Sequence, residues 1–234
     1  MLKINVITPF PNVFDILFNY SILLKASNRK KVEYNIFDLF DYLDNSNQRI
    51  DDYPFGGGDG MILKPEPLSN ALNDALDNND NKDCRVIFPT PDGKLFNHSM
   101  AKDFSNEKEL IFICGHYKGI DQRIRDKYVT DEISIGDFVL TSGELPSMVM
   151  IDSIVRLKEG VLNNYNSACK DSFYDLLLDG PHYTRPRNFR GMQVPKELLS
   201  GNHKEIEEWF LKKRKEKTKL RREDLYLKYK SSKK

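Results

Sequence analysis

An α/β domain on a largely parallel sheet is the fold that the sequence predicts, and three observations lead to it. Residues 84–89 (CRVIFP) and 110–114 (LIFIC) are short apolar runs typical of buried strands. Each run ends at a loop that bears glycine or proline, and a helical stretch follows each loop. Strands that alternate with helices usually form parallel sheets, whose ligands bind beyond the carboxyl ends of the strands.

The remaining elements are expected from similar patterns along the chain. Residues 2–7 alternate as a buried strand does, and Pro9 and Pro11 end that strand. Two short helices at 13–18 and 21–26, a strand at 32–37, and helices at 67–78 and 144–156 are also expected. The chain becomes helical again from Lys204 on, where Trp209 and Phe210 would anchor the helix to a small core.

This pattern predicts three segments. Residues 1–159 form the main domain, residues 160–172 a polar and weakly patterned linker, and residues 173–234 a small helical domain. With 39% hydrophobic residues the chain can bury a sizeable core, which argues against global disorder.

The composition argues against a membrane protein and against a protein held together by zinc or disulfides. No apolar run approaches the roughly 18 residues that a membrane span needs, and the first residues lack the pattern of a signal peptide. These observations predict a cytoplasmic protein with no membrane partner. Cys84, Cys114 and Cys169 include no CxxC pair, so neither a zinc site nor a disulfide framework is expected.

The charge of the chain is unevenly distributed. Residues 204–234 contain 13 Lys or Arg and 6 Asp or Glu, a net charge of +7, which leaves −6 on residues 1–203 of a chain whose total is +1. A basic tail on an acidic body can attract nucleic acid. The same pattern is also typical of a solvated helix face, and charge alone does not decide between the two.

A glycine-rich turn, PFGGGDGM at 54–61, closes a long polar stretch from residue 38. Glycines remove side-chain bulk and permit positive φ, so the backbone of such a turn can approach a base or a phosphate closely. The motif lacks the Gly-Lys-Ser/Thr of a phosphate-binding loop and does not follow a strand as a dinucleotide-binding motif does. By itself it can equally be a flexible turn.

Three further loops stand at expected strand ends. TPDG at 90–93 follows the first apolar run, CGHYKGID at 114–121 follows the second, and SIGDFVLTSGELP occupies 134–146. Each can be an ordinary turn. Together they favour a pocket lined by backbone that binds a flat ligand.

Two polar residues near the linker are candidates for chemistry. Asp171, in KDSF, is a plausible general base, although it can instead cap a helix that begins at Ser172. His182, in DGPHYTRP, can likewise be a packing or surface residue.

The ordered set of motifs carries more information than any single one. DYPFGGGDGM, CGHYKGID, SIGDFVLTSGELP, DSIVR, DSF, DGPHYTRP and SGNH follow one another in this order. The chain thereby closely resembles the bacterial tRNA (guanine-N1)-methyltransferase family, over about residues 4–222. This resemblance implies S-adenosylmethionine bound in a deep trefoil knot, and a homodimer whose active sites lie at the subunit interface. It also implies a tRNA substrate, modified at the guanine just after the anticodon and gripped by the helical C-terminal domain.

The resemblance also implies roles for individual residues. The family's cofactor-binding positions correspond here to Thr90, Pro91, Gly115, Tyr117, Ile135, Gly136, Asp137, Phe138, Val139, Leu140 and Gly143. Asp171 matches the family's proposed base, and Arg156 an arginine near the transferred methyl group and the guanine. The turn at Gly56, Gly57 and Gly58 is expected to close over the target base, with His182 as a further substrate-binding residue.

Four positions depart from the family pattern. His116 stands where an arginine is usual, and Lys118 where a glutamate is thought to hold the cofactor's amino group or to act with magnesium. Because lysine has no acceptor, a role for Mg²⁺ is in doubt. Ser142 replaces a common glycine, and Phe138 a common tyrosine.

Two other functions are compatible with parts of the sequence. The changes at His116 and Lys118 also suit a catalytically weakened RNA-binding protein of the same ancestry, but the retained Asp171 and Arg156 argue against it. A nucleotide-phosphate-binding enzyme that uses the glycine-rich turn is disfavoured because no lysine follows that turn as in a phosphate-binding loop.

Overall fold

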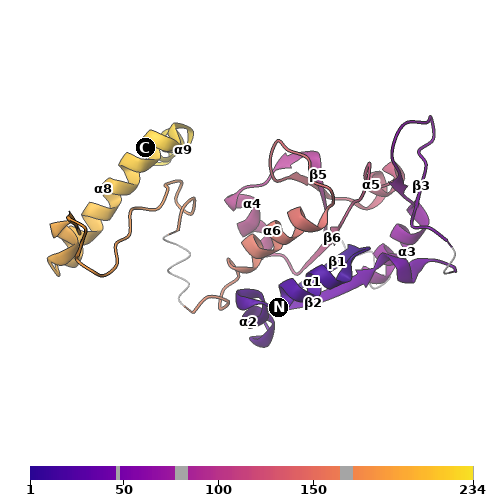
Figure 1. Cartoon of the computed structure of the whole chain (residues 1–234), viewed down its shortest axis with the longest axis horizontal. Helices are drawn as coiled ribbons and strands as arrows, with labels where there is room; N and C mark the ends of the chain where they lie inside the picture. Colours follow the sequence, from indigo (N-terminus) through magenta and orange to yellow (C-terminus); the bar gives the residue numbers. More distant parts are fainter. Residues whose placement is uncertain (46–47, 77–83, 164–170, 234) are drawn as a thin grey trace. The chain divides into compact units, whose positions relative to one another are not determined.

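The computed structural model describes residues 1–45, 48–76, 84–163 and 171–233. The chain divides into two compact units, Met1–Tyr165 and Asn166–Lys234 (Figure 1). This division falls inside the expected linker 160–172, of which residues 164–170 lie outside the described ranges.

A five-stranded sheet with the order β2-β1-β6-β5-β7 forms the centre of the first unit. Its strands are β1 (Leu2–Thr8), β2 (Val32–Asp38), β5 (Cys84–Leu95), β6 (Glu109–Ile113) and β7 (Asp131–Ser134), and all four neighbouring pairs are parallel. The predicted parallel α/β fold is therefore confirmed. The knot implied by the resemblance stays a prediction.

Helices cover the sheet (Figure 1). They are α1 (Pro11–Phe18), α2 (Ser21–Asn28), α3 (Pro65–Ala75), α4 (His98–Ser105), α5 (Gln122–Tyr128) and α6 (Glu144–Val155), with the short helix η1 (Leu39–Tyr42) after β2. The buried side of α3 packs with Ile124 of α5 against Val86, Ile111 and Ile113 of the sheet. Helix α6 contacts α1, α2 and α4. Both sets of contacts fix the strands whose ends carry the loops described below.

The structure corrects two expectations from the sequence and supplies the bounds of three short elements. The TPDG segment is not a turn after β5 but an irregularity within it, since Pro89 and Lys94 both pair with Ile133. Helix α3 begins at Pro65 rather than residue 67, because proline suits the first turn of a helix. No bounds were predicted for strand β7 and for helices α4 and α5, because elements of four to eight residues are too short to show a clear period.

The described part of the second unit, residues 171–233, is built on the helices α8 (His203–Arg221) and α9 (Glu223–Ser232). It also contains the short strands β8 (Asn188–Phe189) and β9 (Met192–Gln193) and the short helix η2 (Lys196–Leu199). Asn202 caps α8 through its side chain, and Trp209 is buried, which confirms the helix and its predicted anchor. Arg214 of α8 pairs with Asp175 and thereby holds the segment that precedes the hairpin.

Two further observations concern the cysteines and the possibility of a membrane-spanning helix. Cys84 and Cys114 are buried free thiols, and burial raises the pKa of Cys84 to about 12. None of the helices within the described ranges combines the length and apolar character needed to cross a membrane.

A polar network centred on a buried asparagine joins β2, β1 and β6. The Asn5 side chain of β1 is fully buried, and its Nδ2 donates to Glu109 Oε1 of β6 at 2.8 Å and to the Ala75 carbonyl at the end of α3 at 3.2 Å. Asn35 of β2 donates to Asn5 Oδ1 at 2.9 Å. Polar groups so deeply buried need these partners, because an unsatisfied one is costly.

We predict that Asn5→Ala lowers the free energy of unfolding by about 1–3 kcal/mol, because it leaves several buried groups without a partner. Asn106→Ala, which removes an exposed hydrogen bond to Lys102, should change it by less than about 0.5 kcal/mol. Urea unfolding followed by circular dichroism measures both. Equal effects of the two substitutions would contradict a stabilising role for this network.

Candidate functional site

A cleft of about 340 Å³ opens where the irregular part of β5 and the loops after β6 and β7 converge. Its lining comes from the irregular part of β5, from the 115–119 loop after β6, and from the 134–143 loop between β7 and α6. This is the carboxyl edge of a parallel sheet, where such folds bind their ligands.

The expected cofactor residues gather in this cleft. The lining includes Thr90, Pro91, Gly115, Tyr117, Ile135, Gly136, Phe138, Val139, Leu140 and Gly143. Asp137 is the exception, because it is exposed on the 134–143 loop and does not line the cleft.

Glycines bring the 115–119 and 134–143 loops into backbone contact. The Gly143 N–H donates to the Gly115 carbonyl at 2.8 Å. A Cβ on Gly143 would lie 2.6 Å from the Gly115 nitrogen and 2.8 Å from the Cys114 Cα, and one on Gly115 would lie 2.8 Å from the Phe88 ring. Neither position has room for a side chain, so backbone forms this part of the cleft.

The glycine-rich turn is fastened to the 115–119 loop at its carboxyl side. Lys118 N–H donates to the Met61 carbonyl at 3.0 Å, and Leu63 N–H donates to the Gly119 carbonyl at 3.1 Å. The Tyr117 hydroxyl bonds to the buried Asp51 carboxylate, which raises the pKa of Tyr117. Strands β3 (Asp51–Asp52) and β4 (Ile62–Leu63) pair on either side of the turn. The turn therefore stands next to the cleft.

The tip of this turn is open. Gly56, Gly57 and Gly58 have φ values of +87°, +80° and +112°, and nothing lies within 4 Å of a Cβ built on any of them. They do not line the cleft. Their backbone conformation requires glycine, and their exposed surface leaves space for a ligand to approach.

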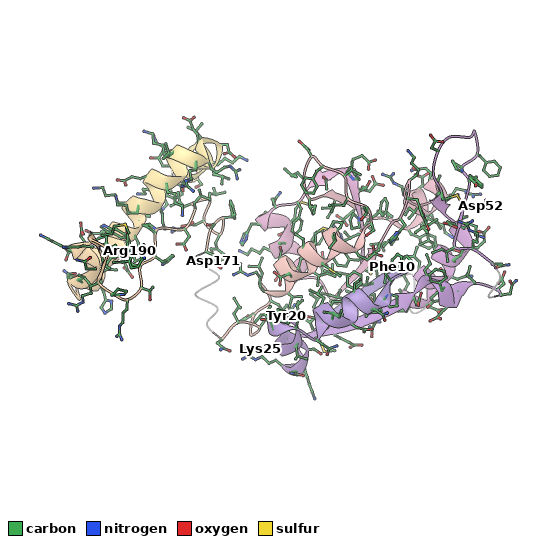
Figure 2. All side chains as sticks on the ribbon, in the orientation of Figure 1. Phe10, Tyr20, Lys25, Asp52, Asp171 and Arg190 are labelled. Carbon is green, nitrogen blue, oxygen red and sulfur yellow. The ribbon has the colours of Figure 1, made fainter. Side chains whose placement is uncertain are left out.

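The three other expected site residues lie outside the cleft lining. Arg156 is half-buried at the end of α6, in the first unit. Asp171 begins the described part of the second unit (Figure 2), and His182, in the same unit, bonds through Nε2 to Asp179 Oδ2 at 2.7 Å. The structure therefore places Asp171 and His182 within their own unit only.

Charged residues that sequence reasoning overlooked surround the cleft. Arg125 of α5 pairs with Asp92 at 2.9 Å and Glu132 at 2.8 Å, and its guanidinium lies 5.3 Å from the centre of the Phe88 ring. Glu144 bonds to His116 at 2.9 Å. In the sequence, the only indication that Glu144 belongs to the site was its position directly after Ser142 and Gly143 in the SGELP motif.

The cleft lining contains cationic side chains but no carboxylate. Its charged or ionisable cationic residues are His116, Lys118 and Arg125. Within the described ranges, no group of three or more His, Cys, Asp or Glu residues is arranged to hold a metal ion. The positive side chains make the lining suited to a ligand with an anionic group.

The sequence is similar to known proteins over nearly its full length. The model of the tRNA (Guanine-1)-methyltransferase TrmD family matches residues 2–228. A tRNA (guanine-N(1)-)-methyltransferase of Staphylococcus carnosus is 50% identical over 228 residues, which cover 97% of this chain and 92% of the relative. The enzyme of the same name from Clostridioides difficile is 48% identical over 227 residues, or 97% of this chain and 98% of the relative. The cleft is thus formed by the motifs of a family whose model spans both units, and the chain belongs to the tRNA (guanine-1)-methyltransferase TrmD family.

Proposed function

We propose that this enzyme is a tRNA (guanine-N1)-methyltransferase that uses S-adenosylmethionine to methylate the guanine directly 3′ of the anticodon. Family membership supports the reaction class. The observation that carries the choice of donor is the cleft at the carboxyl edge of the sheet, where the family's cofactor motifs converge.

The cleft suits a flat, partly charged donor. Its backbone-lined part, at Gly115 and Gly143, allows the close approach that an adenine ring needs to meet peptide groups. Phe138, Val139 and Leu140 add apolar surface, and Lys118 can meet a carboxylate. When bound, S-adenosylmethionine would supply a methyl group on a sulfonium, and the residues of the chain would supply position and charge.

Guanine N1 is a poor nucleophile because it carries a proton at neutral pH. A carboxylate within hydrogen-bond reach must take this proton as the methyl group arrives, and we assign that role to Asp171. The guanine O6 gains negative charge as N1 loses its proton, and Arg156 can stabilise it. An arginine also matches the acceptor edge of guanine.

Recognition of tRNA is assigned to groups from both units. An anticodon loop presents unpaired bases that a protein can take up singly, and the open turn at Gly56–Gly58 can close over one. The basic second unit, with His182, would contact the phosphates of the anticodon stem-loop. We place the enzyme in the cytoplasm, where a tRNA substrate is available.

A homodimer is proposed on the exposed apolar surface of α1 and α6, two helices that contact each other. Val13 and Ile16 of α1 and Leu145 and Val149 of α6 are all at least 38% exposed. Phe10 and Tyr20 extend this surface at the two ends of α1 (Figure 2). A second copy of the chain would cover these side chains and stabilise the pair.

Asp171→Asn should lower the rate of methyl transfer to tRNA by about 100-fold to 10,000-fold, because an amide cannot accept the N1 proton. Its affinity for S-adenosylmethionine, measured by calorimetry, should be unchanged. Asp126→Asn, an exposed substitution of the same kind on α5, serves as the control. Single-turnover rates in Asp171→Asn that match the control would remove Asp171 from this role.

A shared active site predicts complementation between two inactive variants. Gly115→Trp should block the cleft, because even a Cβ there meets Phe88. Mixed with Asp171→Asn, it should recover roughly a quarter of native activity, since random exchange makes half of the dimers mixed and each mixed dimer has one intact site. Native mass spectrometry verifies the exchange. Mixed dimers without activity would rule out the shared site.

Lys118→Glu should increase the dependence of the reaction on Mg²⁺, because a carboxylate at the cleft can attract a cation and an ammonium repels it. Lys127→Glu, on the exposed side of α5, makes the same charge change elsewhere and should leave the dependence as it is. Initial rates across a magnesium titration at constant ionic strength compare the three proteins. Superimposable curves for native and Lys118→Glu would show that Lys118 does not affect the metal.

A further inference from the structure

A buried carboxylate lies directly behind the donor cleft. Glu144, the first residue of α6, is 4% exposed. Burial tends to raise its pKa, but hydrogen bonds from His116, Thr8 and Ser142 outweigh burial and hold the pKa of Glu144 below its usual range. The N-terminal end of a helix also favours a negative charge. Glu144 is therefore a buried anion, and such a charge needs a partner.

His116 is the ionisable partner of this anion. Its Nε2 lies 2.9 Å from Glu144 Oε2 and 3.0 Å from Oε1, and its side chain is 13% exposed. The other partners are neutral hydroxyls: Thr8 donates to Glu144 Oε1 at 2.6 Å, and Ser142 also bonds to the carboxylate. Among the described neighbours of the pair, Cys114 is a buried thiol whose pKa burial raises, so it adds no charge.

The backbone of His116 lies where the two cleft loops cross. It pairs with Ser142 of the 134–143 loop and with Gly119 of its own loop. The contact between Gly115 and Gly143 is immediately next to it. The ring of Phe10, at the start of α1, lies 5.0 Å from the imidazole centre. A shift of His116 would thus move both loops that form the cleft.

We propose that His116 is a positioning residue, whose pairing with buried Glu144 holds the 115–119 and 134–143 loops in the geometry that binds the methyl donor. The inference rests on the proposed binding of S-adenosylmethionine in this cleft. His116 acts through Glu144 and the loops, since its Nε2 is engaged by the carboxylate. Its removal would leave a buried charge with hydroxyl partners only, and the loops would rearrange to let water reach that charge.

Four variants test whether His116 positions the two loops through its bond to Glu144 or only fills space between them. His116→Gln removes the imidazole and leaves the carboxylate, whereas His116→Arg supplies a guanidinium that can bond to the carboxylate. The double variant His116→Gln/Glu144→Gln replaces the imidazole and the carboxylate with two amides that can bond to each other. His203→Gln, at the exposed start of α8, is the matched control.

Calorimetric titration with S-adenosylmethionine gives the dissociation constant of each protein, and thermal unfolding shows which are folded. We expect His116→Gln to bind about tenfold more weakly than native protein. His116→Arg and the double variant should bind within about threefold of native, and His203→Gln should bind as native does. Turnover at saturating donor should fall less than affinity in His116→Gln, because the catalytic groups are untouched.

The binding measurements distinguish a failure of the proposed donor binding from a failure of the positioning role of His116. If the native protein does not bind S-adenosylmethionine, the proposed function fails before His116 is tested. If native protein binds it and folded His116→Gln binds it equally well, only the positioning role is overturned. Should His116→Gln not fold, the other two variants decide: weak binding by both the arginine and the double variant overturns the positioning role of the pair, and near-native binding by either supports it.

Discussion

The close contact between Gly115 and Gly143 is the constraint on which the site depends. Two loops that follow different strands share one backbone hydrogen bond of 2.8 Å, and neither glycine has room for a Cβ. This contact brings the backbone of both loops to one cleft and sets the direction in which α6 begins. The parallel sheet makes the contact possible, because it delivers the ends of β6 and β7 to the same edge.

Two sets of interactions with charged side chains, around Glu144 and around Arg125, also stabilise the segments that form the cleft. The Glu144 carboxylate joins α6 to His116 and to Thr8 at the end of β1, so three segments share one buried charge. At the side, Arg125 joins α5 to Asp92 and Glu132 across the irregular part of β5. Within the part of the chain that the structure describes, Glu144 and Arg125 each have such partners, whereas the cleft lining around Lys118 contains no carboxylate. A donor with a carboxylate group would supply that compensation.

The two units differ in composition, and the proposed recognition of tRNA would draw on both. The first provides a rigid sheet edge, buried helices and the open glycine-rich turn. The second is small, basic and held together by Trp209, Tyr229 and the pairing of Arg214 with Asp175. A surface dominated by long cationic side chains binds phosphates well but specifies little by itself. Specificity for a guanine would then come from the first unit, together with Asp171.

Sequence by itself determined the strands from Leu2, Val32, Cys84 and Leu110 onward, the terminal helix anchored by Trp209, and the family, because apolar periodicity and ordered motifs are local properties. It also indicated most of the cleft residues, though only through the resemblance, and it wrongly made TPDG a turn after a strand. Only the tertiary structure decided that Asp137 does not line the cleft and that Glu144 meets His116 and Thr8. Glu144 and Thr8 are 136 residues apart, and no periodic pattern reports which distant loops a parallel sheet brings to the same edge.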